Sequence, residues 1–126
     1  MRIGHGARIV DDTTLSSGEV IGLGPLASQI RDRQIPLELC VTSNIHTGAV
    51  SDDPHPLGAL HRAGFNVTIN TDNRLMSAVS MSDEVEIART TLGLTASDIT
   101  QLTLNALRAG FGDYSTRQPL IAQLSA

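Results

Sequence analysis

Asp72 is the first candidate in this sequence for a catalytic or metal-binding side chain. It follows a segment in which apolar residues (Phe65, Val67, Ile69) alternate with polar ones (Asn66, Thr68, Asn70). Side chains alternate across a β-strand, so the pattern predicts one apolar and one polar face. α/β folds place their active sites at the carboxyl ends of their strands. A carboxylate at that position can ligate a divalent metal or act as a base. The alternative interpretation is a strand with one face in solvent and no functional role. The alternation of residues is compatible with both interpretations.

His5 is the second candidate, because it lies between Gly4 and Gly6 at the end of a short extended stretch. Glycines on both sides let a ligand approach the backbone closely. A turn histidine without a special role is the alternative. The other three histidines, 46, 55 and 61, lack zinc-motif spacing, so we expect surface or capping roles for them. His55 precedes a proline and is expected to position a helix start.

Two other nucleophile types are present without a catalytic context. Cys40 is the only cysteine and lies in the apolar run 35–41, which predicts a buried structural thiol and fits a reducing compartment. Ser43 has no G-x-S-x-G context, so a hydrolase elbow is not supported. All nine cations are arginine, which excludes lysine Schiff-base chemistry.

The composition predicts one folded domain. Hydrophobic residues make up 40% of the 126 residues, the net charge is −4 and aromatic residues are 2%. A chain of this length can bury a core. Without a basic patch or aromatic stacking platforms, nucleic-acid binding is not expected. No secretory segment or long apolar run is present, which predicts a cytoplasmic location and no membrane partner.

Strand and helix patterns alternate along the chain, which predicts parallel β/α units. The predicted strands are 2–5, 37–41 and 65–70, with a polar loop at 42–54. Helices are predicted at 25–33, at 55–63, from Ser82, from a capping-box-like Thr95, and at 115–126. A polar strand face suits the interior of a closed barrel better than an open sheet covered by helices on both sides. Three strands cannot close a barrel of eight, so the chain is predicted to be its last third.

Several motifs in order give the chain a resemblance to adenosine deaminases of the bacterial type. They are Arg2-Ile3-Gly4-His5-Gly6, the run from Ile35 to Cys40 with Thr42-Ser43-Asn44 and Thr47-Gly48, His55-Pro56-Leu57, and Ile69-Asn70-Thr71-Asp72-Asn73. The run Asn73-Arg74-Leu75-Met76-Ser77 resembles one bacterial branch closely. The resemblance covers nearly all 126 residues. Val41 departs from it, since proline is common there.

The resemblance implies strands six to eight of a TIM-type (β/α)8 barrel and zinc-dependent hydrolytic deamination of adenosine or deoxyadenosine. It implies that Asp72 ligates one Zn²⁺ and orients the attacking water, and that His5 contacts this water and stabilises developing charge. Asn73 stands where many members have a second Asp that bonds a purine ring nitrogen; its amide can donate directly. The expected ligand is a small purine nucleoside, with another adenine compound as the alternative substrate.

The same resemblance implies an incomplete catalyst. The family's H-x-H, its third zinc histidine and the glutamate of H-A-G-E lie upstream, and Asp72 alone cannot hold zinc. Residues 1–126 are therefore expected to be a partial catalytic domain, inactive alone and completed by an N-terminal fragment. A truncated, non-catalytic remnant that associates with itself or a partner through exposed sheet edges is the alternative.

Overall fold

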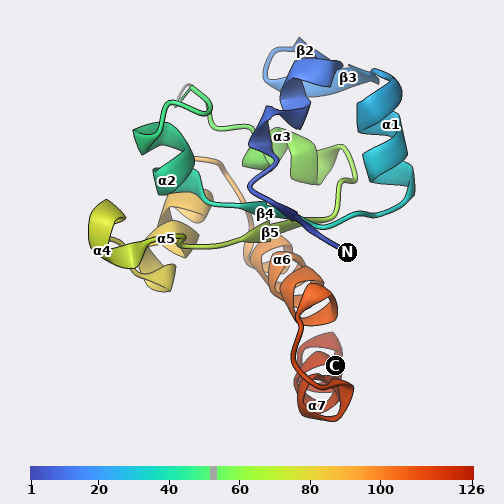
Figure 1. Ribbon diagram of the computed structural model, residues 1–126, viewed down its shortest axis with the longest axis vertical. Helices are drawn as coiled ribbons and strands as arrows, with labels where there is room; N and C mark the ends of the chain where they lie inside the picture. Colours follow the sequence, from blue (N-terminus) through green and yellow to red (C-terminus); the bar gives the residue numbers. More distant parts are fainter. Residues whose placement is uncertain (52–53) are drawn as a thin grey trace.

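A three-stranded parallel sheet lies at the centre of the computed structural model, which describes residues 1–51 and 54–126. Its strands are β1 (Ile3–Gly4), β4 (Leu37–Leu39) and β5 (Val67–Ile69), in the order β1-β4-β5. Figure 1 shows these strands side by side, with helices packed around them. The three predicted strands and their parallel direction are confirmed, and the chain is α/β.

The register aligns the three strands at the same height. Leu37 of β4 pairs with Ile3 on one side and with Val67 on the other. Leu37, Leu39 and Val67 are completely buried in the apolar core, as expected for parallel strands covered by helices. Because β4 is the central strand and pairs with both others, it sets the position of both neighbours along the strand direction.

Helices follow the strands as predicted, and two short helices that the sequence analysis did not predict, at 41–46 and 74–77, are present as well. They are α1 (Pro25–Asp32), α2 (Val41–His46), α3 (Leu57–Arg62), α4 (Arg74–Ser77), α5 (Met81–Thr90), α6 (Ala96–Ala109) and α7 (Tyr114–Ser125), with a 3-10 helix at Ala7–Asp12. The predicted helices at 25–33, 55–63 and 115–126 are confirmed with shifts of one or two residues. No helix in the described ranges is long and apolar enough to cross a bilayer.

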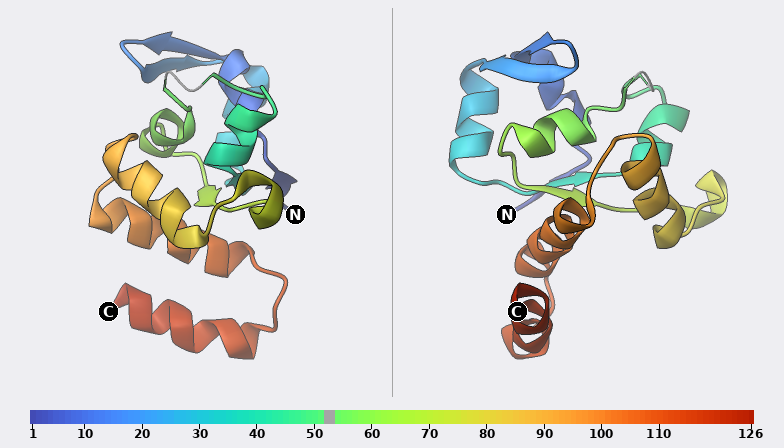
Figure 2. Two further views of the ribbon diagram at one scale, coloured as in Figure 1. Left: turned by 90° about the vertical axis from the view of Figure 1, so that its left-hand side faces the viewer. Right: turned by 180° about the vertical axis from the view of Figure 1, so that it is seen from behind.

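Helix α6 covers β5 directly. Leu102 of α6 is completely buried in the core, and the Asn105 side-chain amide donates to the Val67 carbonyl at 2.9 Å. Figure 2 shows α7 running alongside α6 on the side away from the sheet. The side chains of Val67 and Ile69 are therefore buried, as the sequence predicts.

Capping boxes start helices α5 and α6. The predicted box at Thr95 is confirmed, since its side chain accepts from the Asp98 amide while Asp98 accepts from the Thr95 amide. The start predicted at Ser82 is wrong by two residues. Ser80 is the N-cap of α5 and pairs in the same way with Asp83. A capping box requires a spacing of three residues from one partner to the other, and Ser80, unlike Ser82, lies three residues before Asp83.

The loop predicted at 42–54 is wrong in its first part. Residues 41–46 form α2, so the strand predicted at 37–41 ends at Leu39. Thr, Ser and Asn favour turns over helix interiors in isolation, which is why the helix was not predicted. Residues 52–53 of the predicted loop lie outside the described residues.

An antiparallel hairpin of β2 (Thr13–Ser16) and β3 (Glu19–Leu23) was not predicted either. Its pairing has a register shift between Thr14 and Leu15, so the side-chain alternation that signals a strand is interrupted. Asp12, just before the hairpin, accepts a hydrogen bond from the Ala27 backbone amide at 2.8 Å and so connects the hairpin to α1.

The polar residues of β5 do not face open solvent. Thr68 is only 2% exposed and donates its hydroxyl to the Leu37 carbonyl, and the Asn70 amide donates to Thr68 Oγ1 at 2.8 Å. Among the described residues, β5 is an edge strand of the sheet. The alternative prediction, a strand whose polar face is exposed to solvent, is wrong for Thr68. These hydrogen bonds satisfy the buried Thr68 hydroxyl within the sheet.

Gly6 provides a test of the turn that follows β1. Its φ is +74°, and a Cβ there would lie 2.9 Å from Leu37 Cδ2. Replacing Gly6 with Ala should lower the free energy of unfolding by about 2 kcal/mol, from left-handed strain plus the clash. Gly48→Ala is the control, since its φ is +69° with nothing within 4 Å, and about 1 kcal/mol is expected. Urea denaturation measures both; equal losses would refute the clash.

Candidate functional site

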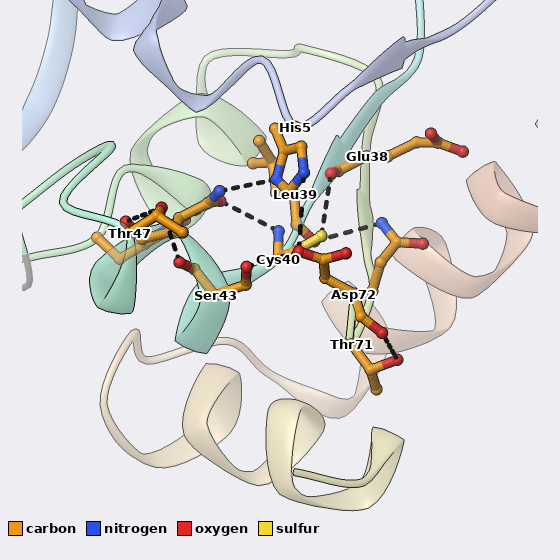
Figure 3. Close-up of polar contacts among 11 residues, drawn as sticks. His5, Glu38, Leu39, Cys40, Ser43, Thr47, Thr71 and Asp72 are labelled. Carbon is orange, nitrogen blue, oxygen red and sulfur yellow. Dashed lines mark hydrogen bonds and ion pairs between the residues drawn. The ribbon is translucent and has the colours of Figure 1, made fainter. Parts of the chain in front are cut away.

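The carboxyl ends of the three strands meet at one edge of the sheet and bring the candidate residues together. His5 follows β1, Cys40 follows β4, and Asp72 follows β5 after two residues. Figure 3 shows these side chains converging, with Ser43 of α2 beside them. Because the strands are parallel, residues far apart in sequence share this edge.

His5 and Asp72 face each other across the site. His5 Nε2 lies 3.9 Å from Asp72 Oδ2, and the two side chains are 49% and 42% exposed. Ser43 donates its hydroxyl to the same carboxylate oxygen at 2.6 Å. One carboxylate oxygen is thus held in place while solvent or a ligand can still reach the pair.

Both candidate residues have left-handed backbone. The φ angle is 59° at His5 and 55° at Asp72. Such conformations cost energy for residues other than glycine, and they cluster at functional sites where the surroundings hold them. Here the turns aim the two side chains toward each other rather than along their strands.

Asn44 connects His5 to the buried His55. Its Nδ2 lies 2.9 Å from His5 Nδ1, and its Oδ1 lies 3.2 Å from the Cys40 amide and 3.3 Å from His55 Nε2. Asn44 is only 1% exposed. Neither Asn44 nor Ser43 was predicted as a site residue; the sequence signal was their presence immediately after an apolar strand, in the stretch predicted as loop.

His55 is 2% exposed, so a surface role for it is wrong. Its expected role at a helix start is confirmed, because Nδ1 accepts the Leu57 amide at the first residue of α3. Burial lowers the pKa of His55 to about 4, so its ring is neutral at physiological pH.

The remaining histidines lie away from the site. His46 is exposed at the end of α2. His61 Nε2 lies 2.9 Å from Asp98 Oδ1. Hydrogen bonds from Thr95, with a further one from His61, lower the pKa of Asp98 to about 2. That pair joins α3 to the start of α6 and has a structural role.

Asn73 lies next to Asp72 and caps α4. Its Oδ1 accepts the Met76 amide at 3.1 Å. This bond fixes the orientation of the side-chain amide, because a backbone N–H can only donate. The side chain is exposed, and its Nδ2 is left as a donor.

A buried glutamate supports the site from behind. Glu84 of α5 is completely buried and accepts the Thr42 amide at 3.3 and 3.4 Å. Thr42 is in the first turn of α2, directly before Ser43. The sequence analysis predicts a helix from Ser82 in this region but assigns no role to Glu84.

Asp72 can supply one ligand to a metal. Its Oδ2 holds the contacts to Ser43 and His5, and no hydrogen bond to a described residue involves Oδ1. No group of three or more His, Cys, Asp or Glu that could hold a metal occurs within residues 1–51 and 54–126. Among these described residues, Asp72 thus offers a free carboxylate oxygen without a cluster of further ligands beside it.

Comparison with known proteins identifies the family of this chain. The adenosine deaminase family model matches residues 1–126. The chain belongs to the adenosine deaminase family. The adenosine deaminase of Mycobacterium leprae is 47% identical over 124 residues, which are 98% of this chain and 34% of that protein. The chain thus spans about a third of the length of the curated relatives that it matches.

Solved structures of related deaminases align with this family member over almost its whole length. The adenine deaminase of Arthrobacter aurescens aligns with a TM-score of 0.83 at 25% identity, covering 98% of this chain and 35% of that one. The N6-methyl-AMP deaminase of Arabidopsis thaliana, in its apo form, aligns with a TM-score of 0.75 at 27% identity, covering 98% and 33%.

The Cys40 thiol offers a test of how well this edge of the sheet is shielded from solvent. Burial, with the nearby carboxylates of Asp72, Glu84 and Glu38, raises the pKa of Cys40 to about 12. A raised pKa keeps the thiol protonated at pH 8, so iodoacetamide should alkylate the folded chain about a thousandfold more slowly than the urea-unfolded chain. Mass spectrometry follows the single cysteine. Similar rates in both states would contradict the buried thiol.

Proposed function

We propose that this chain supplies the last three β/α units of a barrel deaminase that converts adenosine or deoxyadenosine to inosine or deoxyinosine. The observation that carries the proposal is the convergence of His5 and Asp72, 3.9 Å apart at the carboxyl edge of a parallel sheet. In the proposed barrel, β1, β4 and β5 are strands six, seven and eight. The 47% identity to curated adenosine deaminases supports it.

Asp72 is the proposed zinc ligand of this chain. Zinc, when bound, lowers the pKa of a water so that hydroxide is available near neutral pH. Ser43 holds Oδ2 of Asp72 at 2.6 Å, which leaves Oδ1 for the metal. The other ligands and the general acid-base glutamate are proposed to come from the rest of the protein, since one carboxylate is too few for a zinc site.

His5 and Asn73 have proposed roles toward water and purine. His5 is close enough to Asp72 to contact a water held beside that carboxylate and to stabilise negative charge that develops during attack. Asn73 donates from Nδ2 to an acceptor nitrogen of the purine ring, an orientation that its bond to the Met76 amide supports.

The substrate is proposed to be adenosine rather than another adenine compound. Identity to the adenosine deaminases is 45–47%, against 25–27% to the adenine and N6-methyl-AMP deaminases. A buried, unpaired Cys40 also fits the proposed cytoplasmic location.

Reconstitution tests the proposed function. Co-expression with the N-terminal two-thirds of a close relative should yield an assembled pair that deaminates adenosine and contains stoichiometric zinc. The loss of absorbance as inosine forms measures the deamination. Asp72→Ala should lower kcat at least a thousandfold and reduce bound zinc, because it removes a ligand.

Asp113→Asn is the matched control, since Asp113 is an exposed residue at the start of α7 whose side chain makes no capping bond. Its activity should match that of the unmodified pair. A soluble assembled pair without activity would overturn the proposed function.

A second candidate is a non-catalytic module that associates through its sheet edges. Among the described residues, β1 and β5 each pair only with β4, and Leu75, Met76 and Phe111 are 87%, 78% and 81% exposed. Unpaired strand edges and exposed apolar side chains promote association. Sedimentation of the purified chain should then show oligomers that persist when the N-terminal portion is added, whereas the deaminase proposal expects a one-to-one pair.

A further inference from the structure

We propose that Asn44 is a positioning residue that fixes the proton of neutral His5 on Nε2, the ring nitrogen that faces Asp72. The structural claim stands on hydrogen-bond geometry alone, and its catalytic meaning rests on the proposed function. Figure 3 shows His5, Cys40 and Asp72 close together, with dashed lines for the polar contacts around them.

The orientation of the Asn44 amide is set by the backbone. The Cys40 amide donates to Asn44 Oδ1 at 3.2 Å, and a backbone N–H cannot accept. This assigns oxygen to that position, so the other amide atom, Nδ2, points at His5 Nδ1 at 2.9 Å. An NH2 group can only donate, and therefore His5 Nδ1 must carry a lone pair.

A second backbone donor fixes the same network from the other end. The Leu57 amide donates to His55 Nδ1 at 3.1 Å, which places the His55 proton on Nε2. That proton points at Asn44 Oδ1, 3.3 Å away. Both ends give the same amide orientation, and burial keeps His55 neutral with a pKa near 4.

The network has a direct consequence for His5. With Nδ1 accepting, neutral His5 presents N–H at Nε2. The distance of 3.9 Å from Nε2 to Asp72 Oδ2 is too long for a good hydrogen bond, so this N–H remains for an oxygen atom held between the two side chains. His5 would then act as a fixed hydrogen-bond donor to attacking water, and it could not take the proton of that water through Nε2.

Nitrogen NMR of the histidine rings tests the assignment without any activity measurement. The whole chain, labelled with ¹⁵N-histidine, is examined at pH 8.5, and His5→Gln identifies the His5 signals. We expect an unprotonated Nδ1 and a fully protonated Nε2 at His5, whereas exposed His46 should show the averaged shifts of exchanging tautomers.

Asn44→Asp is the decisive variant. A carboxylate of the same shape still accepts from Cys40 and His55, but it offers an acceptor to His5 Nδ1, so Nδ1 should become protonated. Ser43→Ala is the matched control: it removes the neighbouring bond to Asp72 and should leave the His5 proton on Nε2.

Two results would overturn the assignment. One is a wild-type His5 with protonated Nδ1, or with the same averaged shifts as His46. The other is a folded Asn44→Asp chain in which Nδ1 stays unprotonated. If Asn44→Asp does not fold, the wild-type and Ser43→Ala spectra decide alone. Because none of these readouts depends on deamination, failure of the proposed function would leave the result interpretable.

Discussion

Parallel pairing of β4 with both neighbours is the constraint on which the whole site depends. Leu37 is level with Ile3 and with Val67, so the three strands end at nearly the same height. Their following residues therefore emerge at one edge, where left-handed turns at His5 and Asp72 direct the side chains inward. An antiparallel neighbour would have sent one of these residues to the opposite edge of the sheet.

The parts of this arrangement that could be predicted are those encoded by local patterns. Alternation in 65–70 located β5, and the Thr95 box located α6, because side-chain period and capping bonds are properties of neighbouring residues. The candidates His5 and Asp72 were found in the same way, as polar residues at or shortly after the ends of predicted strands. Their distance of 3.9 Å required the sheet register, which no local pattern carries.

The parts that could not be predicted depend on contacts across the chain. Helix α2 consists largely of residues that favour turns, so its formation depends on tertiary packing rather than propensity. Ser43 bonds a carboxylate 29 positions away, and Asn44 a histidine 39 positions away. Once α2 forms, these two consecutive residues reach both sides of the site, one contacting Asp72 and the other His5.

Helix α5 contributes no residue to the site, yet it holds the helix that does. A carboxylate as deeply buried as that of Glu84 is costly unless hydrogen bonds replace its hydration, and its bonds from the Thr42 amide are long. What makes the position favourable is that the first amides of α2 have no partners within their own helix. Glu84 supplies one of these partners, so the placement of Ser43 and Asn44 depends on packing between α2 and α5 as much as on the strand that precedes them.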